Sequence, residues 1–212
     1  MTLSGGAVIE SEKVLVSVGR TPDTDALGLD EAGVETVNRK IKVDDALRTG
    51  RKNVYAVGDC VDGPQLAHKA SYDAIIACDN ISGLQRRADY TNIPYCIWTD
   101  PQIASVGMSE EDARAKRADV KAAKFPYMAS GKAYLEGKTE GFVKITGTTG
   151  GEILGVEILG AMACDLIAEA VLAKTMKINI RDWSGVIHGH PTISEVMQEA
   201  ARAFCGYPIH SV

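Results

Sequence analysis

The chain has 212 residues, a length that folds as one or two domains with a hydrophobic core. Hydrophobic residues make up 45% and charged residues 24% of the sequence, which is the composition of a globular protein rather than a disordered one. The net charge of -5 argues against binding to nucleic acid or to an anionic membrane. No apolar run has the length of a membrane span, and the N-terminus does not resemble a secretory signal.

The cysteines lie far apart in the sequence and form no CxxC or CxxxxC motif. This spacing argues against a zinc cluster, a disulfide scaffold and a self-contained redox pair. Histidines also lack further ligands at metal-binding spacing, so we expect no metal site. Dispersed thiols favour a reducing, cytoplasmic location. The five positions are Cys60, Cys78, Cys96, Cys164 and Cys205.

The first part of the chain reads as a piece of an α/β layer. Residues 14–18 and 54–57 are short β-branched runs that predict buried strands, and residues 41–43 predict a shorter one. Residues 65–81 have helical periodicity. One face of this helix carries mostly small residues, so it is expected to pack closely on a sheet or a ligand; these residues are Ala67, Ala70, Ala74, Cys78 and Ile81.

A polar stretch at residues 83–92 indicates a domain boundary. Beyond it, strands come first and helices later, which predicts an α+β domain. A Gly/Thr turn at residues 147–151 predicts a hairpin, and Ser109 precedes acidic residues that suit the start of a helix. The expected strands are 95–99, 103–106, 120–127, 141–146 and 153–159, and the expected helices begin at 109 and lie around 166–171 and 193–204.

Gly58 and Asp59 follow a predicted strand, and ligands of open α/β sheets bind beyond the carboxyl ends of strands. A carboxylate there can accept hydrogen bonds from sugar or ribityl hydroxyls, and a glycine permits close approach of the backbone. The same two residues also suit a simple turn. On these residues alone, the turn is the favoured interpretation.

The segment His188–Glu195 (HGHPTISE) offers two interpretations of one carboxylate. Glu195 can orient the imidazole of His190 as an acid–base pair and stabilise the imidazolium. Thr192 and Glu195 also have the spacing of a capping box, in which Glu195 only closes the start of a helix. Spacing does not decide between these roles.

The motifs in order resemble the flavin-dependent pyridine nucleotide–disulfide oxidoreductases, and within them the lipoamide branch. The resemblance covers nearly the whole chain, and the last of its segments is the most specific. These segments are 14–22 (VLVSVGRTP), 53–60 (NVYAVGDC), 63–70 (GPQLAHKA), 93–107 (IPYCIWTDPQIASVG) and 188–195 (HGHPTISE).

The resemblance implies a role for several residues. His190 matches the base that takes a proton from the substrate dithiol, and Glu195 matches its partner. In the family this pair serves the active site of the other subunit, so a homodimer is expected, and the bond before Pro191 is expected to be cis. Asp59, with Gly58 beside it, matches the residue that holds the ribityl chain of FAD. The helix start that lies by the flavin ring matches Leu66, Ala67 and His68.

The family's chain is roughly twice as long, and its Gly-rich FAD loop, redox CxxxxC and nicotinamide-binding glycines have no counterpart here. The resemblance therefore implies residues 1–18 as the end of a nicotinamide-binding domain, 19–88 as a C-terminal segment of the FAD-binding domain, and 89–212 as an interface domain with a mixed, mainly antiparallel sheet. After Lys69 and Ala70, the residues Ser71, Tyr72 and Asp73 replace an expected acidic run.

Two functional hypotheses follow. The complete protein would oxidise dihydrolipoamide with NAD through FAD, with a lipoyl domain of a 2-oxo acid dehydrogenase complex as a possible partner. Alternatively, the chain is a stand-alone dimerisation module without catalysis, because it has no disulfide to accept electrons. Within the enzyme class, a glutathione reductase-like protein is the competing assignment.

Overall fold

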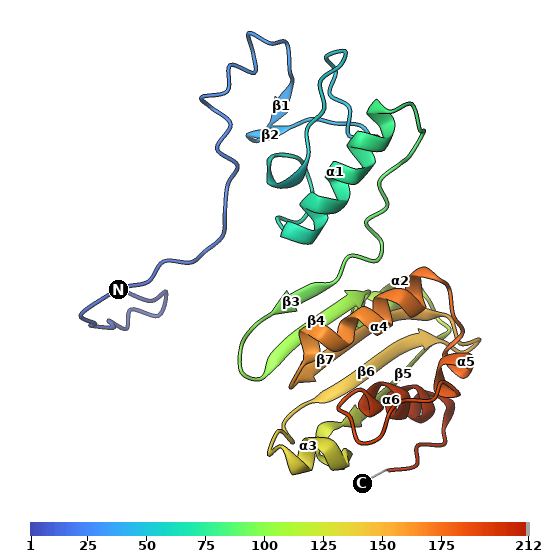
Figure 1. Ribbon diagram of the computed structural model, residues 1–212. Helices are drawn as coiled ribbons and strands as arrows, with labels where there is room; N and C mark the ends of the chain where they lie inside the picture. The colour runs from blue at the N-terminus through green and yellow to red at the C-terminus, as the bar shows by residue number, and fades with distance from the viewer. Residues whose placement is uncertain (211–212) are drawn as a thin grey trace. The chain divides into compact units, whose positions relative to one another are not determined.

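The computed structural model describes residues 1–210 and divides into two compact units between Ala88 and Asp89. Figure 1 shows the elements of each unit. No helix among the described residues is long and apolar enough to cross a membrane.

The first unit contains little regular structure besides one helix. Its elements are β1 (Thr36–Val37), β2 (Lys40–Ile41), the 3-10 turn η1 (Gly58–Cys60) and α1 (Ala67–Ile81). Strands β1 and β2 pair as an antiparallel ribbon. Two small apolar clusters hold the unit together, one around Val34 and Val61 and the other around Leu47 and Ile76.

Two of the strands expected in this unit are absent. Residues 14–18 are extended but unpaired, and Leu15 and Val18 are 91% and 92% exposed. Residues 54–57 form no strand but an isolated bridge between Tyr55 and Arg48, with backbone hydrogen bonds from Thr49 to Val54 and from Ala56 to Leu47. A buried strand needs neighbouring strands for its backbone hydrogen bonds, and among the described residues of this unit the only sheet is the two-residue ribbon of β1 and β2.

Helix α1 buries a different face from the expected one. The small face is half-buried or exposed, whereas the buried face carries Lys69 and Asp73, whose charged groups are 2.6 Å apart and fully buried. The Asp73 carboxylate also accepts the Gly58 N–H at 3.0 Å, and Lys69 donates to the Gly58 carbonyl at 3.3 Å. This buried pair therefore anchors η1 against α1, a role that hydrophobic periodicity does not reveal.

The second unit is an α+β domain, as expected, built on a five-stranded sheet of order β3-β4-β7-β6-β5. Every pairing in this sheet is antiparallel, so it is more regular than the mixed sheet that was expected. The predicted hairpin forms between β6 and β7. The strands are β3 (Tyr95–Ile97), β4 (Gln102–Gly107), β5 (Val120–Pro126), β6 (Phe142–Thr148) and β7 (Ile153–Gly160).

Most helices of this unit cover one face of this sheet (Figure 1). Alternate strand residues such as Val143, Ile145, Val156 and Ile158 point to them and are at most 1% exposed. The strongly amphipathic sequence of α6 buries Val196, Met197 and Ala200 in the same core. The helices of this unit are α2 (Glu110–Lys116), α3 (Gly131–Leu135), α4 (Ala163–Thr175), α5 (Ile180–Ser184) and α6 (Glu195–Cys205).

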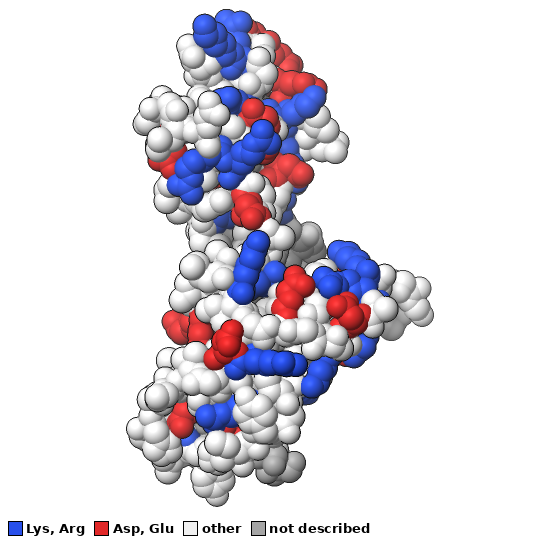
Figure 2. All heavy atoms as spheres, turned by 90° about the vertical axis from the view of Figure 1, so that its right-hand side faces the viewer, with Lys and Arg blue, Asp and Glu red and all other residues white. Residues whose placement is uncertain are grey.

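The opposite face of the sheet is partly apolar and partly charged, and α2 lies near its charged part, with Glu110 3.9 Å from Lys144 of β6. On β3 and β4, Tyr95, Ile97 and Ile103 are between 42% and 52% exposed. Farther along the sheet, Lys144 and Glu157 form an ion pair across β6 and β7 at 2.6 Å. Basic and acidic side chains lie close together over the surface that Figure 2 shows.

Candidate functional site

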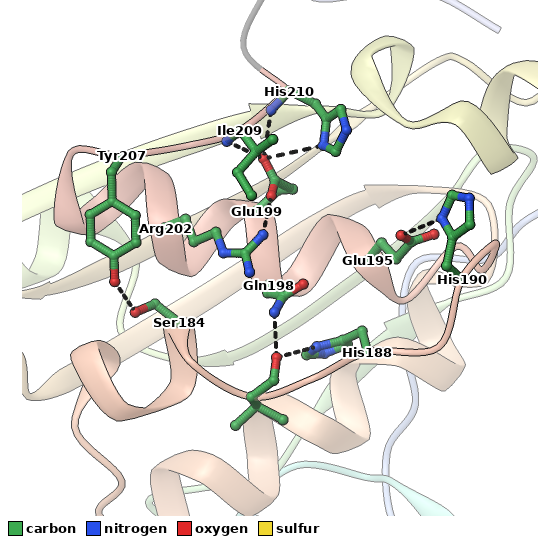
Figure 3. Close-up of polar contacts among 11 residues, drawn as sticks. Ser184, His188, His190, Glu195, Gln198, Glu199, Arg202, Tyr207, Ile209 and His210 are labelled. Carbon is green, nitrogen blue, oxygen red and sulfur yellow. Dashed lines mark hydrogen bonds and ion pairs between the residues drawn. The ribbon is translucent and has the colours of Figure 1, made fainter.

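The candidate base His190 lies in the segment that joins α5 to α6, and its candidate partner Glu195 is the first residue of α6. The segment contains His188, Gly189, His190 and Pro191, and the bond between His190 and Pro191 is cis, as expected. Figure 3 shows this segment and the polar side chains around it. The loop lies beside α6, so the first turn of that helix is the neighbour of the imidazole of His190.

His190 and Glu195 lie together. The distance from Nδ1 of His190 to Oε1 of Glu195 is 2.9 Å, and the histidine side chain is 79% exposed while the glutamate is 25% exposed. The imidazole is therefore held on one side by the carboxylate and open to solvent on the other. Within residues 1–210 no hydrogen bond reaches Nε2 of His190.

Glu195 performs both roles that its spacing allows. While Oε1 contacts His190, Oε2 accepts the backbone N–H of Thr192 at 2.9 Å. Half of the expected capping box is thus present. The hydroxyl of Thr192 does not cap the helix; it donates to the Gly189 carbonyl at 2.7 Å and contacts the Ser194 hydroxyl at 2.8 Å. Regular α6 accordingly begins at Glu195 with Ser194 as N-cap, rather than near 193.

These contacts decide the charge of Glu195. Burial raises the pKa of this carboxyl, but the hydrogen bonds from Thr192 and His190 outweigh burial and lower the pKa below its usual 4.5. Because an ionised carboxylate only accepts hydrogen bonds, Nδ1 of His190 must donate. In the neutral imidazole the lone pair then lies on Nε2, the nitrogen without a described partner. His190 can therefore accept a proton from solvent, or from a bound molecule, at Nε2.

His188, to which the motif assigned no role, fixes the start of the same loop. Nε2 of His188 lies 2.9 Å from Oε1 of Glu169 on α4, and that oxygen also accepts the indole N–H of Trp183 at 2.6 Å. The side chain of His188 is only 6% exposed. Its partner lies 19 residues away, so spacing within the motif contains no signal for this contact.

The far end of α6 holds the last described residues of the chain. Glu199, 5% exposed, pairs with Arg202 at 2.8 Å and accepts the backbone N–H groups of Ile209 and His210 at 2.8 and 3.0 Å. The hydroxyl of Tyr207 contacts that of Ser184 at 2.5 Å (Figure 3). The tail is thereby fixed against α5 and α6.

The candidate cofactor residues lie in the first unit. Asp59, in η1, is half-buried, and its carboxylate has no hydrogen bond within residues 1–210. Gly58 has a φ of +78°, and a Cβ there would lie 3.1 Å from Cβ of Ala70. Its backbone N–H and carbonyl already bind Asp73 and Lys69. The close approach that this glycine permits is therefore to α1.

Leu66, Ala67 and His68 form the start of α1. Leu66 is the N-cap, no side chain caps the helix, and its first turn contains no acidic residue. An uncapped helix start of this kind favours an acceptor or a negative charge. No group of three His, Cys, Asp or Glu among the described residues is arranged to hold a metal ion.

Comparison with known proteins places both units in one family. Residues 93–201 match the pyridine nucleotide-disulphide oxidoreductase dimerisation domain, and residues 1–74 match the pyridine nucleotide-disulphide oxidoreductase domain. The chain is 43% identical over 206 residues to a dihydrolipoyl dehydrogenase of Bacillus subtilis and 42% identical over 205 residues to that of Halobacterium salinarum. In each comparison 96% of the chain is matched, but it spans only 44% and 43% of the relative.

Solved structures show the same likeness. LpdA of Mycobacterium tuberculosis matches with a TM-score of 0.87 and 26% identity, over 95% of this chain and 44% of its own. The HOCl-induced flavoprotein disulfide reductase RclA of Escherichia coli matches with a TM-score of 0.82 and 26% identity, over 90% and 44%. Because the dimerisation-domain match alone covers more than half of its residues, the chain belongs to the pyridine nucleotide–disulphide oxidoreductase family.

Proposed function

We propose that this chain supplies the C-terminal part of an FAD- and NAD-dependent dihydrolipoamide dehydrogenase. The observation that supports this function best is the exposed imidazole of His190, fixed through Nδ1 by the ionised Glu195 at 2.9 Å. A dithiol must lose a proton before it attacks a disulfide, because the thiolate is the nucleophile. His190 is the base for that step. The relatives named dihydrolipoyl dehydrogenase favour this substrate over glutathione.

Each residue of the pair has a separate task. The lone pair on Nε2 of His190 accepts the proton of the substrate thiol, and the imidazolium that forms keeps its Nδ1–H on Glu195. Glu195 is already bound to the Thr192 N–H, which holds the carboxylate in place as the charge on the ring changes. The disulfide that receives the electrons lies outside residues 1–212, since the sequence has no CxxxxC pair.

The first unit suits part of an FAD site. The carboxylate of Asp59 is a half-buried acceptor for ribityl hydroxyls, beside the close backbone turn at Gly58. The start of α1 at Leu66 to His68 has no side-chain cap and suits an electron-rich ring, although the Leu66 N–H itself donates to the Pro64 carbonyl at 3.1 Å. Bound FAD supplies the transfer of electrons between the disulfide and NAD. These residues bind and orient that group.

A homodimer completes the proposal. His190 would act on the disulfide of the neighbouring subunit, so the second unit serves as the interface. The exposed Tyr95, Ile97 and Ile103 on the uncovered sheet face support such an interface, since solvent-exposed apolar patches mark contact surfaces. A lipoyl domain would present the substrate.

We also propose boundaries for the domains of the complete protein. Residues 1–18 would end the nicotinamide-binding domain, 19–88 would belong to the FAD-binding domain, and 89–212 would form the interface. The division of the chain between Ala88 and Asp89 supports the second of these boundaries. The cytoplasmic location stays a prediction.

The test uses a full-length chain in which residues 1–212 follow the N-terminal part of the Bacillus subtilis relative. His190→Gln should reduce dihydrolipoamide turnover by about a hundredfold or more, while the flavin absorption of the protein stays unchanged. His210→Gln is the matched control, because this exposed histidine lies at the other end of α6. Equal turnover in His190→Gln and the parent would refute the role of His190.

The full-length protein tests the substrate class, and the 212-residue chain alone tests the competing hypothesis of a dimerisation module. Faster turnover of glutathione disulfide than of lipoamide would replace the proposed substrate. Full dihydrolipoamide turnover by the 212-residue chain alone would contradict the proposed division of labour, because it would require an electron acceptor within this segment.

A further inference from the structure

Two thiols of the second unit lie against each other. Sγ of Cys96 is 3.9 Å from the carbonyl oxygen of Cys164, and Sγ of Cys164 is 3.8 Å from the carbonyl oxygen of Ile97. Sγ of Cys164 also lies 3.7 Å from the carbonyl oxygen of Ile103. Both cysteines are half-buried and reduced. Each thiol therefore lies against the backbone beside the other cysteine: Cys96 contacts Cys164 itself, and Cys164 contacts Ile97, the residue after Cys96.

The fold explains why these two residues meet although they are 68 positions apart. Cys96 lies on edge strand β3, opposite Ala104 of β4, which is 1% exposed on the face that α4 covers. Cys164 lies in the first turn of α4. Figure 1 shows α4 lying across this part of the sheet. The thiols therefore meet between the edge of the sheet and the start of the helix.

We propose that Cys96 and Cys164 form a reversible intrachain disulfide when a hydroperoxide oxidises the protein. This site is separate from the His190–Glu195 pair and does not depend on the proposed function. The other three cysteines lie elsewhere in the fold. Cys60 and Cys78 belong to the first unit, and Cys205 lies at the end of α6.

The reaction balances in two steps. The sulfur of Cys164 gives up its proton and attacks the terminal oxygen of the hydroperoxide; the S–O bond forms, the O–O bond breaks, and the departing oxygen takes up the thiol proton and leaves as water from hydrogen peroxide or as an alcohol from an alkyl hydroperoxide. Sulfur is oxidised to a sulfenic acid and the peroxide is reduced. The sulfur of Cys96 then attacks the sulfenic sulfur, the S–S bond forms, and the hydroxyl leaves as water with the proton of Cys96.

The environment of each thiol determines which of the two reacts with the peroxide first. Cys164 lies in the first turn of α4, at the open end of the contact between the helix and the edge of the sheet. Burial, together with the neighbouring Cys164, raises the pKa of Cys96 to about 11, so this thiol stays protonated. Cys164 is therefore the residue that meets the peroxide, and Cys96 is the residue that resolves the sulfenic acid.

The experiment treats the 212-residue chain with hydrogen peroxide, blocks the remaining thiols, and maps peptides by mass spectrometry with and without a reductant. The expected product is a reducible Cys96–Cys164 peptide pair while exposed Cys78 stays open to labelling. Cys96→Ser should leave a sulfenic acid on Cys164 that dimedone traps. Cys164→Ser should give neither product, and Cys78→Ser, the matched control, should behave as the parent does.

Two results would overturn the proposal. One is recovery of Cys96 and Cys164 as free thiols under conditions that oxidise Cys78. The other is a pairing pattern that is identical in buffer and in urea, because selective pairing must be lost when the fold that brings β3 and α4 together is lost.

Discussion

Glu199 is a buried carboxylate that joins α6 to the tail that follows it. Burial raises its pKa, but the hydrogen bonds from the His210 backbone, Arg202 and the Ile209 backbone outweigh burial and lower the pKa below 4.5. A carboxyl whose pKa is lower in the folded chain stabilises the fold fully above its unfolded pKa. That contribution is lost as the pH falls through the folded pKa.

Glu199→Gln should therefore lower the free energy of unfolding by about 2 kcal/mol near neutral pH and by less in acid, because a charged acceptor of three hydrogen bonds is lost. Urea unfolding followed by the fluorescence of Trp183, which is 2% exposed, reports on this unit. Glu111→Gln, at an exposed position of α2, serves as control. The same loss in acid as at neutral pH would show that the charge of Glu199 contributes nothing.

His188 gives the second unit a pH dependence of the opposite sign. Its hydrogen bond to Glu169 raises its pKa above 6.5, although burial opposes the shift. A histidine whose pKa is raised on folding stabilises the fold fully below its unfolded pKa, and this contribution is lost as the pH rises through the folded pKa. The free energy of unfolding should therefore decrease above about pH 6.5.

His188→Gln and Glu169→Gln should both remove this decrease, because either change removes the pair whose charge titrates. Glu169→Gln should also cost about 1 kcal/mol or more, since the indole N–H of Trp183 loses an ionised acceptor. The measurement is the free energy of unfolding in urea on both sides of the histidine pKa. An unchanged slope in both variants would assign the pH dependence to other groups.

At the scale of elements, β4 and β7 pair at a distance that only glycine permits. Gly155 of β7 lies opposite Gly107 of β4, and a Cβ at Gly155 would lie 1.9 Å from the carbonyl oxygen of Met108. That oxygen belongs to the backbone and has no flexible side chain to move aside. The end of β4 would have to separate from β7.

Gly155→Ala should accordingly lower the free energy of unfolding of the second unit by about 3 kcal/mol. Gly150→Ala is the matched control in the β6–β7 turn, because its nearest neighbour would lie 3.6 Å from the added Cβ. Both variants are compared by their urea midpoints with Trp183 as the reporter. Equal midpoints would mean that the sheet adjusts locally without cost.

Periodicity predicted the elements that carry their own burial pattern. Helix α6 follows from the spacing of Val196, Ala200 and Phe204, and the predicted hairpin forms as β6 and β7. Short helices α3 and α5 give no such signal, because five residues do not complete a periodic face. Residues 14–18 and 54–57 are apolar enough for burial, but they do not form strands because no neighbouring strand pairs with them along their length.

The candidate site was predictable only where its partners are close in sequence. The contact of His190 with Glu195 spans five positions, and the motif indicated it. The contact of His188 with Glu169 and that of Cys96 with Cys164 join distant segments, and only the fold reveals them. Local spacing also did not show that Glu195 uses one oxygen for each of its two partners.

At the scale of the whole molecule, the two units differ in how well they bury apolar residues. The second unit has one large core around its sheet and helices, whereas the first has two small clusters. Residues 14–18 of the first unit leave Val14, Leu15, Val16 and Val18 between 67% and 92% exposed. An exposed apolar segment in extended conformation, with unpaired backbone groups, favours pairing with another chain.

We therefore expect the 212-residue chain to form assemblies larger than the proposed homodimer through this segment. Replacing Leu15 and Val18 with Asp should reduce association measured by light scattering and sedimentation, because two charges oppose strand pairing. The unfolding midpoint of the second unit, followed by Trp183, should not change, since the substitutions lie in the other unit. Cooperative, monomeric unfolding of the parent chain at micromolar concentration would contradict this expectation. Unchanged association of the variant would instead assign the contact to the exposed sheet face of Tyr95 and Ile97.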